Sequence, residues 1–235
     1  MNRAASADPS GPAPPPVPPV AAALFADRLP QAEAYAALLA AEGPVRGLLG
    51  PREVPRIWER HLLNCAVLTE LIPVGARVVD VGSGAGLPGL VLAIRRPDLR
   101  VDLVEPMLRR TRFLEDAVRR LELTGSVRVV RGRADEAGVV STVGPANWVV
   151  ARAVAPLDRL VKWCLPLLAV SGRLLALKGA TAQEEVAAHR DSLRRLGIGE
   201  LTVRRLGDGM AADPTWVVSA ARAARHSGRP RRSGA

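Results

Sequence analysis

The chain has 235 residues and a formal net charge of +10, from 33 basic and 23 acidic residues. This length suffices for one α/β domain with a full core, and no apolar run is long enough to span a membrane. The two cysteines, Cys65 and Cys164, lack the spacing of metal ligands. We therefore expect no metal and no membrane association, and we predict a cytoplasmic protein with reduced thiols.

The positive charge predicts a polyanionic partner, most simply nucleic acid bound through its phosphates. Only two of the basic residues are lysines. An arginine-rich proteome would produce the same bias without any such partner, and this alternative stays open.

Both ends of the chain are expected to lie outside the folded domain. Residues 1–23 are rich in proline, alanine and serine and lack the apolar stretch of a signal peptide, which predicts a disordered tail. Residues 221–235 are arginine-rich, without an acid, and predict a second one. Between them we predict a single domain over 24–220, with helices in 24–75 and a Rossmann-like core in 76–220.

Apolar periodicity predicts the elements in chain order. Helices are expected at 31–42 and 54–71, ahead of the core. A strand and helix then alternate, in the segments 78–81, 87–94, 100–105, 107–123, 126–131, 147–151, 157–169, 173–177 and 183–196. The last two strands, 201–206 and 216–220, are joined by a link too short for a crossover helix, so they must pair antiparallel.

The most informative segment is residues 78–89, Val-Val-Asp-Val-Gly-Ser-Gly-Ala-Gly-Leu-Pro-Gly. An apolar strand stops here at a glycine-rich turn, and a short helix follows. Such a turn lets a ligand approach the backbone closely, and the combination is typical of nucleotide-binding folds. A purely structural strand–helix turn is the alternative.

The glycine spacing favours S-adenosylmethionine as the ligand. A dinucleotide fingerprint requires a glycine where this chain has Leu87, and no Lys-Ser/Thr pair follows as in a phosphate-binding loop. Asp80 would repel phosphates but attract the positively charged cofactor. Glu105, at the end of the next strand, suits a pair of ribose hydroxyls, although it could also be a helix N-cap.

The alternation predicts an α/β fold with a doubly wound sheet of seven mostly parallel strands. With a C-terminal antiparallel hairpin and an N-terminal helical extension, this is the class I, Rossmann-like methyltransferase architecture. Ligands of such sheets bind at the carboxyl ends of the strands. Cofactor contacts are therefore expected at Asp80, Gly82, Gly84, Gly86, Leu87 and Glu105.

The turn after the fourth strand bears on the methyl acceptor. It has neither the Asn-Pro-Pro-aromatic sequence typical of adenine amino methylation nor a cysteine nucleophile; it has Arg152. Guanine N7 carries a lone pair and no proton, so its methylation needs no general base. We predict catalytic roles for Arg152 and Lys178, with an ion pair and a solvated side chain as the respective alternatives.

The chain resembles the RsmG (GidB) family over residues 30–220. The shared motifs are Asp80–Gly89, Arg109–Leu114, 151–153, 176–179 and, ahead of the first strand, Arg60–Cys65. The resemblance implies a bacterial enzyme that methylates guanine N7 in 16S ribosomal RNA, as naked RNA or in the small subunit. It also implies cofactor contacts at Ala134, Asp135 and Arg152. Asn64-Cys65 departs from the Asp-Ser pair often found there.

RNA contacts are predicted for Arg60 and His61 and for Arg109, Arg110 and Arg112. A packed histidine and an ordinary solvated helix face are the alternatives. We expect a monomer. A nicotinamide-dependent oxidoreductase and a non-catalytic RNA-binding protein of the same fold remain the competing functions.

Overall fold

The computed structural model describes residues 13–152, 155–208 and 214–224. Its centre is a seven-stranded sheet of strand order 3-2-1-4-5-7-6. The strands are β1 (Arg77–Val81), β2 (Arg100–Glu105), β3 (Val127–Arg131), β4 (Ala146–Arg152), β5 (Leu168–Lys178), β6 (Ile198–Leu206) and β7 (Thr215–Arg222).

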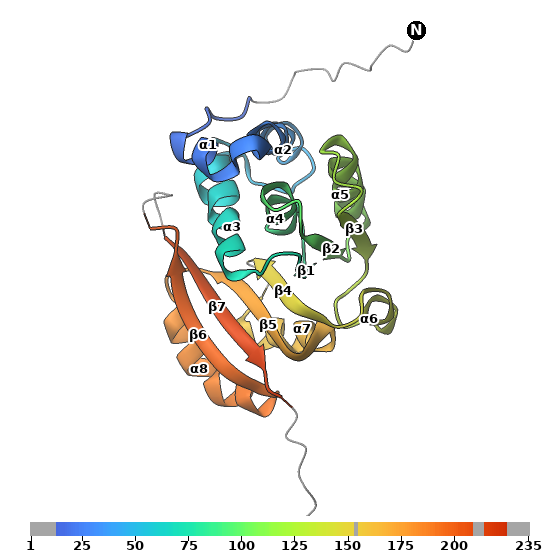
Figure 1. Cartoon of the computed structure of the whole chain (residues 1–235), viewed down its shortest axis with the longest axis vertical. Coiled ribbons are helices and arrows are strands. Elements are labelled where there is room, and N and C mark those ends of the chain that lie inside the picture. Colours follow the sequence, from blue (N-terminus) through green and yellow to red (C-terminus); the bar gives the residue numbers. More distant parts are fainter. Residues whose placement is uncertain (1–12, 153–154, 209–213, 225–235) are drawn as a thin grey trace, which may run out of the picture.

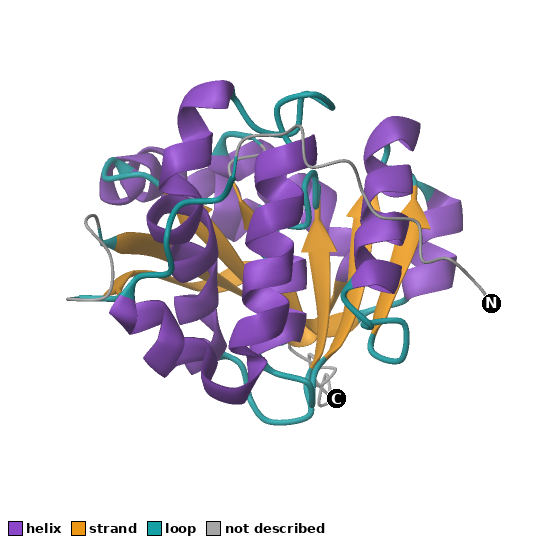
Figure 2. Cartoon of the chain, turned by 90° about the horizontal axis from the view of Figure 1, so that it is seen from above, coloured by secondary structure: helices purple, strands orange, loops and turns teal. Residues whose placement is uncertain are grey.

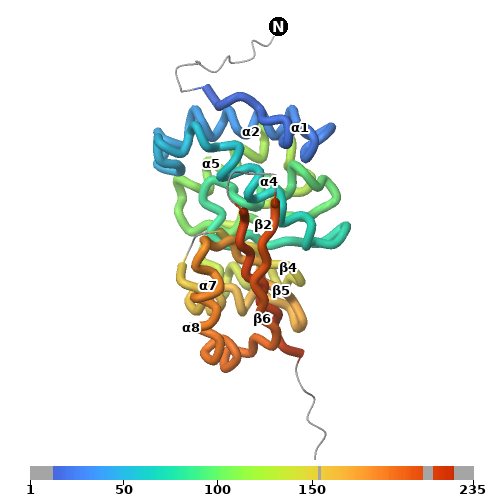
Figure 3. The backbone as a smooth tube through the Cα atoms, turned by 90° about the vertical axis from the view of Figure 1, so that its left-hand side faces the viewer, coloured from blue at the N-terminus to red at the C-terminus, as the bar shows by residue number. Residues whose placement is uncertain are grey.

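The first five strands are parallel, and β7 pairs antiparallel with both β5 and β6. The C-terminal hairpin therefore forms one edge of the sheet (Figure 3). The predicted topology is confirmed.

Helices cover both faces of the sheet (Figures 1 and 2). One core layer contains the apolar faces of α1 (Pro19–Phe25), α2 (Leu29–Glu42), α4 (Gly89–Arg95) and α5 (Leu108–Arg120). The other contains those of α6 (Ala137–Val143), α7 (Leu157–Cys164) and α8 (Ala182–Arg195). Strand residues alternate between the two layers, Val78 facing the first and Val79 the second, as the period of a strand requires.

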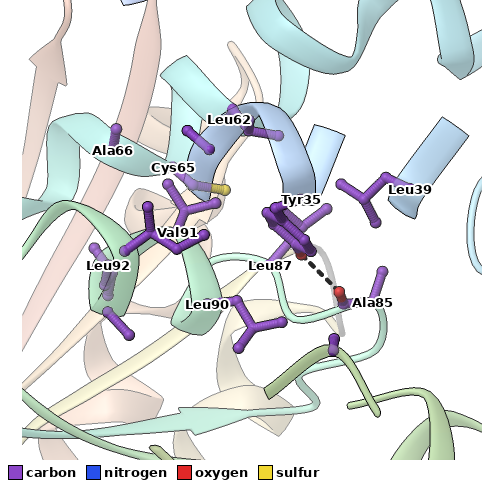
Figure 4. Close-up of a cluster of buried hydrophobic side chains, with 14 of the residues drawn as sticks. Tyr35, Leu39, Leu62, Cys65, Ala66, Ala85, Leu87, Leu90, Val91 and Leu92 are labelled. Carbon is purple, nitrogen blue, oxygen red and sulfur yellow. Dashed lines mark hydrogen bonds between the residues drawn. The ribbon is translucent and has the colours of Figure 1, made fainter. Parts of the chain in front are cut away.

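The N-terminal helices pack directly on the glycine turn and α4 (Figure 4). The Tyr35 hydroxyl donates to the carbonyl oxygen of Ala85 at 2.6 Å, and both residues are buried. Leu39, Leu62 and Leu90 belong to the same apolar cluster. The helical extension is thus part of the scaffold that fixes the turn.

The expected regular helix over 54–71 is wrong. This segment is a 3₁₀ turn (Pro51–Arg56), a π-helical turn (Ile57–Leu63), the short α3 (Asn64–Ala66) and a second 3₁₀ turn (Val67–Leu71). Pro55 cannot donate a backbone hydrogen bond, and π turns often accompany functional sites.

The predicted domain boundaries need correction at both ends. Helix α1 begins at Pro19, Ala21 is buried, and the Trp58 Nε1 donates to the Pro15 carbonyl oxygen at 3.1 Å. Strand β7 ends at Arg222, whose guanidinium donates to the carbonyl oxygens of Leu165 and Leu168. The rest of the predicted tails, 1–12 and 225–235, lies outside the described residues.

Smaller differences concern two other segments. Helix α6 between β3 and β4 is absent from the sequence-based expectation, because its seven residues contribute only Val139 and Val143 to the core. The predicted helix 157–169 stops at Cys164, and β5 begins at Leu168. Within the described ranges, no helix has the length and apolarity needed to cross a membrane.

Candidate cofactor site

A cavity of about 190 Å³ lies at the carboxyl ends of β1, β2 and β3. Its wall comes from the ends of these strands, the segments that follow them and α7. The lining residues are Val81, Gly82, Val104, Glu105, Pro106, Met107, Arg110, Gly132, Arg133, Ala134, Asp135 and Trp163. This edge of the sheet is where open α/β folds bind their ligands.

Glu105 connects the cavity to the glycine turn. Its Oε2 accepts a hydrogen bond from the Gly84 N–H at 2.9 Å, and its Oε1 accepts one from the Met107 N–H at 3.0 Å. The Arg110 Nη1 lies 3.8 Å from Oε2. The carboxylate is almost completely buried but lines the cavity. Two lone-pair sites remain on its oxygens, so it can still accept from ribose hydroxyls.

The turn itself requires glycine. Gly86 has φ +93°, and a Cβ there would lie 2.4 Å from the Leu90 Cδ1 and 3.0 Å from the Tyr35 hydroxyl. Gly84 has φ +57°, but a Cβ there would meet only the Gly82 carbonyl oxygen, at 3.8 Å. Gly86 is therefore needed for packing, whereas Gly84 is needed for backbone conformation and leaves open space.

Asp80 lies beneath this turn, fully buried. Its Oδ2 accepts from the Gly89 N–H at 3.0 Å at the start of α4, while Oδ1 has no hydrogen-bond partner among the described residues. Burial raises the pKa of Asp80 to about 7, against the effect of the Gly89 N–H and the Arg152 charge. An unsatisfied buried oxygen is costly, and a nearby cation would stabilise its ionised form.

The segment after β3 places Ala134 and Asp135 in the cavity wall, as predicted from the resemblance. Arg133 Nε donates to Asp135 Oδ1 at 3.3 Å, and its guanidinium carbon lies 5.8 Å from the Trp163 ring centre. Sequence reasoning missed Trp163 and Met107. The scarcity of aromatic residues, 3% of the chain, was the available signal for Trp163.

Arg152, at the end of β4, is not among the residues that line this cavity, and it contacts the N-terminal extension. Its Nη2 lies 2.9 Å from the His61 Nδ1, and its Nη1 donates to the Arg60 carbonyl oxygen at 3.3 Å. Asp80, Gly84, Gly86 and Leu87 also lie outside the cavity lining. Of the residues predicted to bind the cofactor, only Gly82, Glu105, Ala134 and Asp135 line it.

Lys178 is held by partners on two other segments and is not the solvated side chain considered as its alternative. Its Nζ pairs with the Glu185 Oε1 at 2.9 Å and donates to the Ala155 carbonyl oxygen at 2.8 Å. The same Glu185 oxygen accepts from the Leu157 N–H at 2.6 Å. This arrangement connects β5, α7 and α8, and it does not bring Lys178 together with Arg152.

The residues predicted to contact RNA fall into separate places. His61 is buried with both ring nitrogens engaged, which fits the packed histidine better than an RNA contact. Arg60 is half exposed and pairs with Glu53 at 3.2 Å. Arg110 lines the cavity. Arg109 and Arg112 are exposed and, with Val45 and Arg46, line a separate shallow depression.

The residues present fit S-adenosylmethionine. Glu105 offers a buried acceptor in the cavity, Asp80 has an unpartnered buried oxygen, and no side chain projects from Gly82 or Gly84. Among the described residues, no group of three or more His, Cys, Asp or Glu side chains could hold a metal. The site therefore suits an organic cation with hydroxyl groups.

Solved structures have the same fold. One is a putative S-adenosyl-L-methionine-dependent methyltransferase of Methanococcus maripaludis, with a TM-score of 0.54, 12% identity, and coverage of 71% of this chain and 87% of that one. Another is an O-methyltransferase family protein of Burkholderia thailandensis, with a TM-score of 0.54, 14% identity, and coverage of 83% and 63%. The fold is that of the class I methyltransferases, and the residues of the site suit S-adenosylmethionine.

Sequence comparison identifies the family to which the chain belongs. The GidB family, described as rRNA small subunit methyltransferase G, matches residues 28–212. The ribosomal RNA small subunit methyltransferase G of Salinispora tropica is 57% identical over 227 residues, which cover 94% of this chain and 91% of that protein. The protein of that name from Streptomyces coelicolor is 54% identical, with coverage of 87% and 84%. The chain belongs to the GidB family, as the sequence motifs predicted.

Proposed function

We propose that this protein transfers a methyl group from S-adenosylmethionine to N7 of a guanine in 16S ribosomal RNA, in the cytoplasm. The observation that carries the proposal is the cavity at the carboxyl edge of the sheet, with Glu105 held by two backbone N–H groups, in a chain of the GidB family. The small-subunit RNA specified by the names of the relatives supplies the substrate class.

S-adenosylmethionine, when bound, supplies an electrophilic methyl group on a sulfonium centre. Glu105 would hold the ribose, Ala134, Asp135 and Trp163 would enclose the base, and the glycine turn would leave room for the rest. Asp80, which is buried beneath the turn, would act on the positive charge of the cofactor from a distance. These assignments use only carboxylate acceptor sites that contacts within the protein do not already occupy.

The titratable groups around the cavity support guanine N7 as the methyl acceptor. They are Glu105, Arg110, Arg133 and Asp135, and each carboxylate already accepts from backbone or arginine donors. Because N7 has no proton to lose, orientation of the nucleophile toward the methyl group is the main requirement. We assign to Arg152 the guanine edge, where a guanidinium can donate to O6.

The reaction is tested with methyl-labelled S-adenosylmethionine and small ribosomal subunits from a strain lacking the gene. We expect label in 16S RNA and, after nuclease digestion, in 7-methylguanosine identified by mass spectrometry. Label in another nucleoside would overturn the choice of N7. Absence of label, together with retained RNA binding, would favour the non-catalytic RNA-binding protein.

We place one RNA contact at the depression lined by Val45, Arg46, Arg109 and Arg112. It adjoins the cofactor cavity through the start of α5, where Met107 and Arg110 line that cavity. Arg46 is paired with Glu42 at 2.5 Å. Arg109 and Arg112 form no ion pair with the described residues, and three guanidinium groups favour the phosphate backbone.

The Arg109→Ala/Arg112→Ala double variant should weaken RNA binding and reduce the slope of log K against log salt by roughly 1 to 2, because two phosphate contacts are lost. Arg190→Ala/Arg194→Ala on α8 makes the same change of charge on the opposite face and is the matched control. Equal slopes for the two double variants would place the RNA elsewhere.

A further inference from the structure

Glu53, His61 and Arg152 form a continuous chain of hydrogen bonds between the segment that precedes β1 and the end of β4. Glu53 comes from the 3₁₀ turn, His61 from the π-helical turn and Arg152 from the end of β4. The Glu53 Oε2 lies 2.9 Å from the His61 Nε2, and the Arg152 Nη2 lies 2.9 Å from the His61 Nδ1. Only 6% of the His61 side chain is exposed, so its surroundings are fixed by the protein.

The partners of His61 determine which ring nitrogen carries the proton. A guanidinium only donates hydrogen bonds, so Nδ1 must be the acceptor toward Arg152. The proton of the neutral ring is then on Nε2, where it is donated to the Glu53 carboxylate. Burial, then the charge of Arg152, lowers the pKa of His61 to about 4, while Glu53 opposes this and Arg60 adds to it. The ring is neutral at pH 7.

The position of Arg152 depends on these contacts. Its remaining described partners are the Arg60 carbonyl oxygen at 3.3 Å and the Cys65 Sγ at 3.9 Å, both weak by distance. With His61 they use three of the five guanidinium N–H groups among the described residues. Two donors are left for a substrate, and β4 neighbours β1, which carries the glycine turn.

We propose that Glu53 and His61 are positioning residues, which hold the Arg152 guanidinium in the orientation needed for methyl transfer. Glu53 holds the ring through its Nε2–H, and the Nδ1 atom of His61 fixes the guanidinium. The inference rests on the proposed function, since it assigns Arg152 to the guanine edge. It also gives a role to a buried histidine beside the half-buried Arg152.

Two amide substitutions distinguish the roles of the two ring nitrogens of His61. In His61→Asn the amide oxygen takes the place of Nδ1 and still accepts from Arg152, whereas His61→Gln retains a donor toward Glu53 and loses that acceptor. At saturating S-adenosylmethionine we expect kcat to fall on the order of 10- to 100-fold for His61→Gln, because a displacement of about 1 Å can cost that much. His61→Asn should lose about threefold or less, and KM for the RNA should stay constant in both.

The control is His189→Asn, the same change on α8, where kcat should equal that of the unsubstituted protein. An increased KM for RNA with unchanged kcat would mean that His61 contacts the RNA. Equal losses of kcat in the Asn and Gln variants, in parallel with a lowered Tm, would mean that His61 serves only in packing. Either result overturns the positioning role.

Nitrogen-15 NMR of histidine-labelled protein tests the network without relying on activity. The unsubstituted protein should show His61 as the neutral Nε2–H tautomer, with no titration between pH 5.5 and 8. Glu53→Gln should retain this tautomer and the ring position because the amide oxygen still accepts, whereas Glu53→Ala should keep the Nε2–H tautomer, since Arg152 still donates to Nδ1, but should release the ring and lower kcat. A protonated ring or the Nδ1–H tautomer in the unsubstituted protein would overturn the inference, whereas missing methyl transfer with the expected tautomer would overturn only the proposed function.

Discussion

At the scale of single residues, the site depends on two buried carboxyl groups with different surroundings. Both oxygens of Glu105 accept from backbone N–H groups. Asp80 has one such bond and one unpartnered oxygen. Their environments differ accordingly: Glu105 lines the cavity and can accept from hydroxyl groups, whereas Asp80 is buried beneath the glycine turn, outside the cavity lining.

Glu105→Gln should weaken S-adenosylmethionine binding by about tenfold or more, because a charged acceptor is replaced by a neutral one. The amide oxygen can replace only one of the two carboxylate acceptors, so the turn around Gly84 should loosen as well. Isothermal titration calorimetry measures the affinity. Glu115→Gln, on the exposed side of α5, is the matched control. Equal affinities for the two variants would remove Glu105 from the site.

The pKa of Asp80 has a consequence for stability. Because its pKa is raised to about 7, the folded state binds more protons than the unfolded state between about pH 4 and pH 7. The free energy of unfolding should therefore fall as the pH rises through this window, by up to a few kcal/mol. Asp80→Asn should remove this decrease and be at least as stable at pH 8, with weaker cofactor binding.

Urea unfolding at pH 5 and pH 8 measures the difference for both forms. Asp191→Asn, exposed on α8, makes the same change of charge without burial and should behave like the unsubstituted protein. A free energy of unfolding that rises from pH 5 to pH 8 in the unsubstituted protein, but not in Asp80→Asn, would mean that Asp80 is stabilised in its ionised form before any cofactor binds.

At the scale of elements, the helical extension supports the site from outside the sheet. Helix α1 contributes Phe25, whose ring meets that of Trp58 edge-on with the centres 6.4 Å apart. Trp58 lies in the π-helical turn that also carries Arg60 and His61. Tyr35 of α2 reaches the glycine turn at Ala85. The helices ahead of β1 therefore join α1 to the π-helical turn and α2 to the glycine turn.

Phe25→Ala should lower the free energy of unfolding by about 3 to 5 kcal/mol, since a fully buried aromatic ring leaves a cavity. Removal of residues 1–12 leaves the contacts of α1 and Phe25 in place and serves as the control. Denaturant unfolding followed by circular dichroism measures both. A loss below about 1 kcal/mol for Phe25→Ala would mean that α1 is not integral to the fold.

At the scale of the whole molecule, the excess of positive charge is spread over separate places. The depression at Arg109 and Arg112 lies on α5, whereas Arg222 belongs to β7 and donates to two backbone carbonyl oxygens. Arg225, Arg229, Arg231 and Arg232 follow beyond the described residues. Arg222 is therefore part of the fold and has to stay in any truncated form.

A truncated protein ending at Ala224 should bind 16S RNA more weakly and show a smaller slope of log K against log salt. The decrease should be roughly 0.7 for each of up to four lost phosphate contacts. Filter binding at several salt concentrations measures it, and the Tm should not change. An unchanged slope would show that the arginines after residue 224 make no contact with the RNA.

The sequence by itself determined the fold class, the cofactor and the family. A buried strand, a glycine turn and a helix are adjacent in the chain, so local pattern and backbone freedom suffice to predict them. The position of Glu105 at a strand end also follows from periodicity. The same argument predicted correctly that Arg152 and Lys178 end parallel strands.

Only the tertiary structure decided what these end residues do. Glu185 is distant in sequence from Leu157 yet binds both it and Lys178, and Glu53 reaches Arg152 only through His61. Periodicity likewise predicted one regular helix over 54–71, where the structure has a π-helical turn flanked by 3₁₀ turns and a short α-helix. Hydrogen bonds between distant segments depend on side-chain direction and on the length of each turn, which no local pattern in the chain encodes.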